Sequence, residues 1–331
     1  MTARARLLRL AAALAALAAG GAGIVVVAAL LRSEPGPISQ SAALGAFSAA
    51  SPQRQLLGGR IATPLQPRFP APPVGATVFG REAGPDALGL AVVPGRPRSL
   101  VRVSVVSAEG PGQAGLDVTV GFGRRAPARL SPCGQGCYQA RVATGGADEE
   151  TVRLDGRPYG FPLPTAGAAP AGGAIVEQAT RVWRSLKTLV WNERLGSSPD
   201  DVLHTRYVAI APDELAYTIK GLSAAVIIGG TRWDRSTQTG PWVRSVQDPP
   251  LQVPVPFWYS VSDAHVLGAG LVNGRSVWTV SFFDPTTAAW FEAEIDKQSG
   301  RTLELNMTAA SHFMHHVYGP FNASLRLEPP R

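Results

Sequence analysis

Side chains that could bind a transition metal lie close together near the C-terminus. The stretch Thr302–Phe321 reads TLELNMTAASHFMHHVYGPF. It contains three histidines and two methionines: His312, His315, His316, Met307 and Met314. Imidazole and thioether groups suit copper better than calcium or magnesium. Alternation along a strand would put His312, Met314 and His316 on one face, and one interpretation of these three residues is a copper site.

Two other interpretations of this stretch stay open. Residues on one face of a strand are roughly 7 Å apart, so a metal would need a ligand from a neighbouring strand, for example Asp263 or His265. In a helix the three histidines would share one face at closer spacing, but the pattern around Leu303–Leu305 favours a strand. The interpretation without a metal is that these side chains hydrogen-bond across a sheet and that Met307 packs in the core.

The N-terminus has the features of a membrane anchor. Three arginines precede an unbroken apolar run from Leu10 to Leu31. As a helix this run would span roughly 30 Å of hydrocarbon, and it is longer than the apolar part of most cleaved signals. Basic residues before a span keep the N-terminus in the cytoplasm. We therefore predict a single-pass protein of the cell membrane with extracytoplasmic domains, while small residues near Gly20 leave cleavage open.

The cysteines fit an oxidising compartment. Cys133 and Cys137 are the only two, in SPCGQGCY, and the residues between them include two glycines that allow a tight loop. A disulfide is the expected state outside the cytoplasm. The alternative is a thiolate pair that binds Cu(I).

Composition divides the chain into an anchor, two linkers and two folded regions. Pro, Ala, Gly and Ser dominate the first linker, which predicts a flexible tether. Short alternating apolar runs separated by PGRP, EGPGQ and GGADEE then predict a small, Ig-like antiparallel β-sandwich. The predicted segments are the anchor 1–32, linker 33–85, sandwich 86–155, linker 156–172 and C-terminal domain 173–331.

The C-terminal domain begins with one amphipathic helix and continues as strands. Apolar residues recur at helical spacing in one stripe: Ile175, Val176, Ala179, Val182, Trp183, Leu186, Leu189 and Val190. Alternating runs follow from His204 onward, and DKQSG at Asp296–Gly300 is a hairpin signal. The pattern predicts an antiparallel half-barrel sheet wrapped on the helix, so that the fold class is mainly β (α+β).

Aromatic side chains could line the hollow of such a half-barrel. Pockets for apolar ligands use this kind of surface. The candidate ligand-binding residues are Tyr217, Phe257, Trp258, Trp278, Phe282, Trp290 and Phe291. The alternative is an ordinary core in which these rings pack against Trp183 and Leu186 of the helix.

Catalysis and nucleic-acid binding find little support. The sequence lacks G-x-S-x-G, a phosphate-binding loop, H-E-x-x-H and C-x-x-C-H, and we predict that the protein is not an enzyme. The formal net charge is +7, but the basic residues do not cluster on one element with interleaved aromatics. We therefore expect no nucleic-acid partner.

Several stretches resemble known families. His204–Pro330 resembles the LolA/LppX-type envelope lipoprotein carriers in its helix, RYVAIAPDELAY, the Gly-Gly-x-x-Trp-Asp turn, and a Trp–Phe strand entering IDKQSGRTLEL. Leu88–Leu154, with CGQGCY, resembles the FixH/YtkA kind of sandwich. The order of anchor, tether, sandwich and ELNMTAASHFMHHVYGPF is similar to the extracytoplasmic tail of CopD-type copper-resistance proteins, although only one span is present here.

These resemblances imply one main function and two alternatives. The main hypothesis is an anchored, non-catalytic protein that holds an apolar or lipid-like ligand in the half-barrel. The first alternative is a copper-resistance accessory module that uses the His/Met cluster. The second is an interaction scaffold for a membrane transporter.

Overall fold

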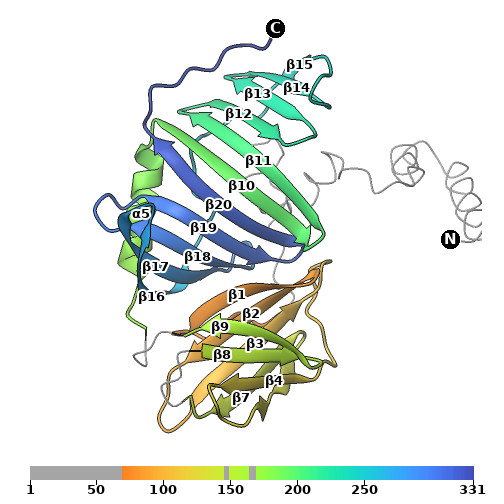
Figure 1. Cartoon of the computed structure of the whole chain (residues 1–331), viewed down its shortest axis with the longest axis vertical. Helices are drawn as coiled ribbons and strands as arrows, with labels where there is room; N and C mark the ends of the chain where they lie inside the picture. Colours follow the sequence, from red (N-terminus) through yellow and green to blue (C-terminus); the bar gives the residue numbers. More distant parts are fainter. Residues whose placement is uncertain (1–68, 145–148, 164–168) are drawn as a thin grey trace, which may run out of the picture. The chain divides into compact units, whose positions relative to one another are not determined.

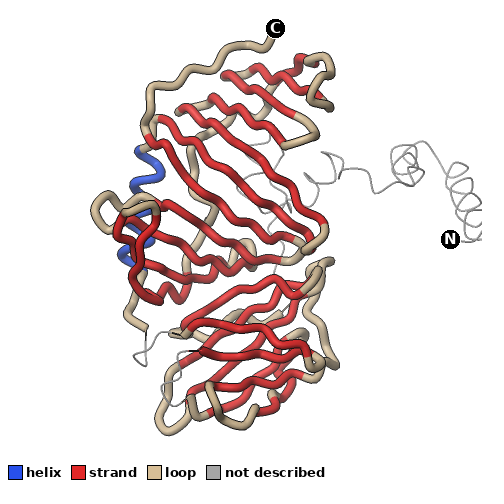
Figure 2. Tube along the Cα trace, viewed as in Figure 1, coloured by secondary structure: helices blue, strands red, loops and turns tan. Residues whose placement is uncertain are grey.

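The structure is a computed structural model that describes residues 69–144, 149–163 and 169–331. The predicted anchor and most of the first linker lie outside these residues. Among the described residues, no helix is both long and apolar enough to cross a membrane. The anchor therefore stays a prediction. Strands dominate the described part, with a single helix (Figure 2).

The first folded region consists of two small antiparallel sheets around one core. The five-stranded sheet has the order β1-β2-β3-β7-β6 and the four-stranded sheet has the order β5-β4-β8-β9. The strand bounds are β1 Thr77–Ala83, β2 Asp86–Val93, β3 Ser99–Val106, β4 Val118–Phe122, β5 Ala128–Arg129, β6 Ser131–Gly134, β7 Cys137–Val142, β8 Glu149–Leu154 and β9 Arg157–Pro162. Both sheets contribute buried side chains, among them Leu90, Val103, Phe122, Tyr138 and Phe161.

Two of these strands lie in segments that were predicted from the sequence to be linkers. β1 lies within the predicted first linker and pairs with β2 over its whole length. β9 lies within the predicted second linker and brings Phe161 into the core. β9 is the edge strand of its sheet, and an edge strand tolerates prolines such as Pro158 and Pro162 because one row of its N–H groups has no partner in the sheet.

The predicted disulfide is confirmed. Cys133 in β6 and Cys137 in β7 are joined, with their Cα atoms 5.0 Å apart. The two strands are antiparallel neighbours, so the bridge closes the tight loop between them.

The second folded region is an eleven-stranded antiparallel sheet, called the large sheet below, with the order β15-β14-β13-β12-β11-β10-β20-β19-β18-β17-β16 (Figure 1). Its helix, α5, spans Gly173–Ser185. The strand bounds are β10 Thr188–Ser198, β11 Asp201–Ile210, β12 Glu214–Ile219, β13 Ala224–Ile228, β14 Thr231–Arg235, β15 Val243–Val246, β16 Ser262–Val272, β17 Arg275–Asp284, β18 Ala289–Asp296, β19 Thr302–Ala309 and β20 His312–Phe321.

The helix is shorter than its apolar stripe predicted. Leu186 is already extended, and Leu189 and Val190 belong to β10 rather than to α5. Helical spacing and strand alternation coincide over these few residues, and β-branched Thr188 and Val190 favour the strand. The predicted mainly β class is confirmed, and β16 is a strand that the sequence interpretation did not identify.

α5 packs against one face of the large sheet, called the inner face below. Buried residues of the helix, Val176, Ala179 and Trp183, share one hydrophobic cluster with alternate residues of the strands. The opposite face, called the outer face, carries Phe283, Trp290 and Phe313.

The outer face is buried against the five-stranded sheet at a pair of glycines. Gly80 of β1 and Gly89 of β2 lie opposite each other, and the side chain of Trp290 lies directly over them. A Cβ atom on Gly89 would lie only 2.1 Å from Cζ2 of Trp290. Phe69 and Val78 of the first region and Phe283 and Phe313 of the large sheet complete this cluster. The absence of side chains at the glycine pair is what allows the close approach.

We expect Gly89→Ala to lower the free energy of unfolding by about 1–3 kcal/mol, because the added methyl group overlaps the indole ring. Urea unfolding of the full-length chain measures this change. Gly268→Ala is the matched control, since Gly268 is also a strand glycine but an added Cβ atom there would have no other atom within 4 Å. Equal stability of the two variants would contradict the close packing at Trp290.

Candidate ligand-binding site

The inner face of the large sheet is covered by two elements, which we call the cover. One is α5 and the other is the irregular segment 251–258, which has no strand pairing. The segment contributes four buried apolar side chains to the inner-face cluster: Leu251, Val253, Phe257 and Trp258. The cover therefore buries the inner face mainly through side chains.

Several aromatic rings of the cover contact rings of the sheet. Trp183 of α5 lies edge-on to Tyr318 of β20, with ring centroids 5.1 Å apart. Phe257 lies 4.4 Å from the His316 ring, and Trp258 lies 5.4 Å from Phe282 of β17. Edge-to-face contacts of this kind add about 0.5–1.5 kcal/mol per pair beyond simple burial.

Few hydrogen bonds hold the cover in place. Trp183 donates its indole N–H to Thr302 Oγ1 of β19 at 3.2 Å. Trp258 donates to Thr180 Oγ1 of α5 at 3.0 Å, which links the two parts of the cover to each other. One backbone bond, from Val253 N to Pro212 O, ties the segment to the turn after β11. Among the described residues, backbone pairing is confined to the start of α5, where Gly172 N donates to Ala264 O of β16 and Val266 N donates to Pro170 O. The rest of the cover is attached by single bonds.

Most of the predicted ligand-binding residues meet on this face. The inner-face cluster contains buried Tyr217, Phe257, Trp258, Phe282 and Phe291. Trp278 is partly buried at its margin, with Lys297 Nζ 3.7 Å from its ring centroid.

Trp290 does not belong to this set, and its prediction as a ligand-binding residue of the same hollow needs correction. It lies on the outer face against the glycine pair. The reason is strand alternation, since Trp290 directly precedes Phe291, whose ring is on the inner face.

A buried polar group lies within the aromatic layer. His316 Nε2 is 2.6 Å from Glu193 Oε2, and the two side chains are 0% and 1% exposed. The other ring nitrogen, Nδ1, is 2.6 Å from the hydroxyl of Tyr318. Tyr207 donates its hydroxyl proton to Glu193 Oε1 at 3.1 Å. Every polar atom named here has a protein partner, as buried polar groups require.

Burial controls the protonation of this group. Desolvation lowers the pKa of His316, although the hydrogen bond and charge of Glu193 act in the opposite direction. Desolvation and then the charge of Glu193 raise the pKa of Tyr207 and of Tyr318 well above the usual range. The tyrosines therefore stay neutral and act only as hydrogen-bonding groups at physiological pH.

The predicted metal residues lie together on the inner face. His312, Met314 and His316 are buried in β20, whereas His315 is on the outer face, 3.5 Å from Glu304. Both ring nitrogens of His316 already contact protein groups. Over the described residues there is no group of three or more His, Cys, Asp or Glu side chains that could hold a metal.

The predicted extra metal ligands have other roles. Asp263 Oδ1 accepts a hydrogen bond from Gly75 N at 2.6 Å. The His265 ring lies 2.9 Å from the carbonyl oxygen of Asp263. The copper site stays a prediction.

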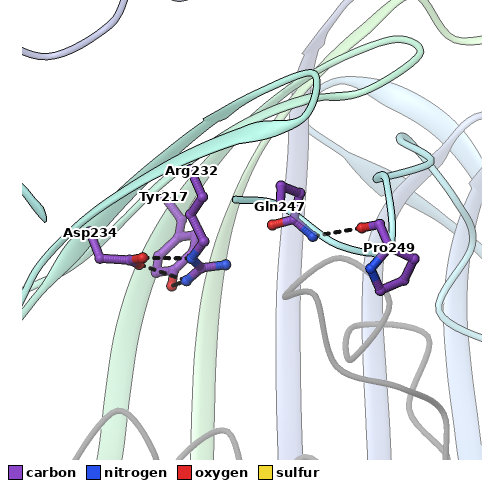
Figure 3. A network of polar contacts seen from close by, with 5 residues as sticks. All are labelled: Tyr217, Arg232, Asp234, Gln247 and Pro249. Carbon is purple, nitrogen blue, oxygen red and sulfur yellow. Dashed lines mark hydrogen bonds and ion pairs between the residues drawn. The ribbon is translucent and has the colours of Figure 1, made fainter. Parts of the chain in front are cut away.

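A second polar group lies at the far end of the inner face, on strands β12 to β15 (Figure 3). Arg232 forms two contacts of 2.6 Å with the carboxylate of Asp234 and donates to the Tyr217 hydroxyl at 2.9 Å. Gln247, just after β15, donates from Nε2 to Pro249 O at 2.8 Å. The inner face is therefore mostly apolar, with one polar group at its centre and a second at this end.

Glu193 was not identified from the sequence as part of a buried polar group, because the end of the helix was placed too late in the chain. Leu189, Trp191, Glu193 and Leu195 alternate along β10 and all but Glu193 are apolar. An acidic residue at an apolar position of an alternating run is a signal for a buried carboxylate, but the helical stripe through Val190 concealed it.

Comparison with known proteins gives only distant similarity. No protein-family model and no curated protein matches the sequence. LprF from Mycobacterium bovis matches at a TM-score of 0.37 and 7% identity, covering 49% of this chain and 99% of LprF. Lipoprotein LppX from Mycobacterium tuberculosis matches at 0.34 and 10%, covering 47% of this chain and 97% of LppX.

A LolA superfamily protein from Nitrosomonas europaea matches at 0.23 and 10%, covering 49% of this chain and 96% of its own length. The resemblance of the C-terminal domain to LolA/LppX-type proteins stays a prediction from the sequence. The similarity to FixH/YtkA and CopD-type proteins stays a prediction. The site itself is argued from this chain's own residues.

Acid should destabilise the fold through His312. Burial lowers the pKa of His312 to about 4. The charge of Glu193 acts to raise this pKa, and His316 makes a smaller contribution that lowers it. In the unfolded chain an ordinary histidine titrates near 6.5, so between pH 6.5 and 4 the unfolded state binds a proton that the folded state does not. The contribution of His312 to the free energy of unfolding is therefore fully present above about pH 6.5. This free energy falls by about 3 kcal/mol as the pH drops from about 6.5 to about 4.

We expect His312→Asn to flatten this pH dependence, measured as the urea midpoint between pH 7 and pH 4. His204→Asn is the matched control, because His204 is an exposed histidine on β11. An unchanged slope in His312→Asn would mean that His312 is not the responsible group.

Proposed function

We propose that this protein binds an apolar or lipid-like ligand, without chemistry, between the inner face of the large sheet and the cover. The observation that carries the proposal is the aromatic layer, which is closed by one helix and one irregular segment rather than by further strands. The ligand would take the place of cover side chains such as Phe257 and Trp258.

The energetics favour such an exchange. Each large aromatic side chain buries roughly 150–250 Å², so opening the cover into water is strongly unfavourable. A ligand that buries the same rings removes most of that penalty and shifts the population toward the open state. If the start of α5 stays paired with β16, the bonds that must break include Trp183 to Thr302 and Val253 to Pro212. Each contributes only about 0.5–1.5 kcal/mol net.

We further propose that the protein works outside the cytoplasmic membrane on a single-pass anchor. The basic, apolar N-terminus supports the anchor, and the Cys133–Cys137 bridge fits an oxidising compartment. A membrane transporter that exchanges ligand with the protein would be a partner on the same side.

Saturable binding of N-phenyl-1-naphthylamine to the purified full-length chain, followed by its fluorescence, tests the proposal. We expect Thr302→Val to take up this probe roughly 2- to 10-fold faster, because it removes the acceptor of the Trp183 indole and so eases opening. Thr279→Val is the control, since Thr279 loses bonds to Glu294 on the outer face instead. Absence of saturable binding in the parent protein would rule out this function.

Copper binding makes a separate prediction. Because His316 is engaged at both nitrogens, we expect Cu(I) and Cu(II) affinities of the parent and of a His312→Ala, His316→Ala variant to be equal. Competition with a chromophoric chelator measures both. A large loss of affinity in the variant would restore the copper module as the better hypothesis.

A further inference from the structure

The second polar group of the inner face lies on one surface because of the strand register. Arg232 in β14 lies opposite Ile227, a member of the inner-face cluster, and opposite Ser245 of β15. Gln247 follows Ser245 by two residues, and its backbone N–H donates to Gly230 O at 2.9 Å. Residues two apart on a strand share a face, so Gln247 and Arg232 both belong to the inner face (Figure 3).

The charges of this group are balanced. The side chain of Arg232 is 11% exposed and pairs with Asp234 through two short contacts. Burial acts to lower the pKa of Arg232, but its hydrogen bond to Asp234 and the neighbouring Tyr217 outweigh burial and raise it. The guanidinium therefore stays charged, and together with the carboxylate it forms a unit of zero net charge.

Gln247 provides a buried acceptor that its surroundings leave unused. The residue is 3% exposed, and Nε2 is committed to the carbonyl of Pro249. Because a carbonyl oxygen can only accept, this bond fixes which end of the amide is nitrogen. Oε1 is buried and has no hydrogen-bond partner among the described residues. Leaving such an atom without a donor is unfavourable, so its position indicates a missing donor.

We propose that Gln247, Arg232, Asp234 and Tyr217 form the subsite for the polar head of the bound ligand, and that this head is a neutral, hydroxyl-bearing group. The inference rests on the proposed function. A hydroxyl donates to Gln247 Oε1 and adds no charge beside the Arg232–Asp234 pair. A phosphate ester or a carboxylate would bring negative charge beside Asp234, whereas an ammonium group would bring positive charge beside Arg232.

The subsite joins the apolar part of the face directly. Tyr217 contacts Arg232 through its hydroxyl while its ring belongs to the inner-face cluster, 5.7 Å from the Tyr207 ring. A ligand with its head at Gln247 can therefore lay its apolar chain along the aromatic layer toward Trp191 and Phe257. The expected ligand class is a lipid with a polyol head.

Displacement of N-phenyl-1-naphthylamine from the full-length chain by three single-chain lipids tests this subsite. The competitors are 1-monooleoylglycerol, methyl oleate and 1-oleoyl lysophosphatidate. We expect monooleoylglycerol to bind roughly 3- to 10-fold more tightly than methyl oleate, the range expected for one neutral hydrogen bond. Lysophosphatidate has the same acyl chain but an anionic head, and we expect it to be the weakest of the three competitors.

Gln247→Met should abolish the preference for monooleoylglycerol and leave methyl oleate affinity unchanged, because it removes the acceptor at nearly constant volume. Gln238→Met, at an exposed glutamine in the β14–β15 turn, should keep the preference. A preference that survives in Gln247→Met, no preference in the parent, or tightest binding of lysophosphatidate would each overturn the subsite while leaving apolar binding intact. Failure of the parent to bind the naphthylamine probe at all would instead overturn the proposed function.

Discussion

The large sheet has apolar side chains on both faces, and each face must be removed from water. The inner face is buried by α5 and the segment 251–258, and the outer face by the five-stranded sheet at Trp290. The contacts that bury the two faces differ in how closely the surfaces fit together. The outer contact is a close fit of an indole ring on two glycines, which has little freedom to change. The inner contact is made through aromatic rings and a few side-chain hydrogen bonds, and this difference is why we propose the inner face as the place where a ligand enters.

Polar groups inside the inner face add a second constraint. A buried polar pair such as Glu193–His316 contributes little net stability, because the desolvation of both groups offsets the gain from their hydrogen bond. The same holds for Arg232 and Asp234 at the far end of the face. A core that served stability alone would gain as much from apolar side chains at these positions. Two polar groups along an aromatic surface, one of them the charge-balanced Arg232–Asp234 pair, are consistent with our proposal of a long, apolar, neutral ligand that carries hydrogen-bonding atoms.

The order of elements in the chain links these features. α5 lies directly before β10, the strand that carries Glu193, and the irregular segment lies between the edge strands β15 and β16. Asp284 fixes the C-terminal end of this segment by accepting from Tyr259 N and Ser260 Oγ. The segment therefore crosses the inner face from one sheet edge to the other and has a firm attachment beyond Trp258, while its middle contributes only side chains.

The sequence by itself determined the strand-rich class, the disulfide, most strand positions and the separation of His312, Met314 and His316 from His315. These properties depend on local alternation and turn residues such as DKQSG, which act over a few positions along the chain. Only the tertiary structure decided that the indole of Trp290 packs on Gly80 and Gly89 and that Glu193 meets His316. Each of these depends on which distant strands become neighbours, since a side chain's face and its partners follow from sheet register, which no local pattern encodes.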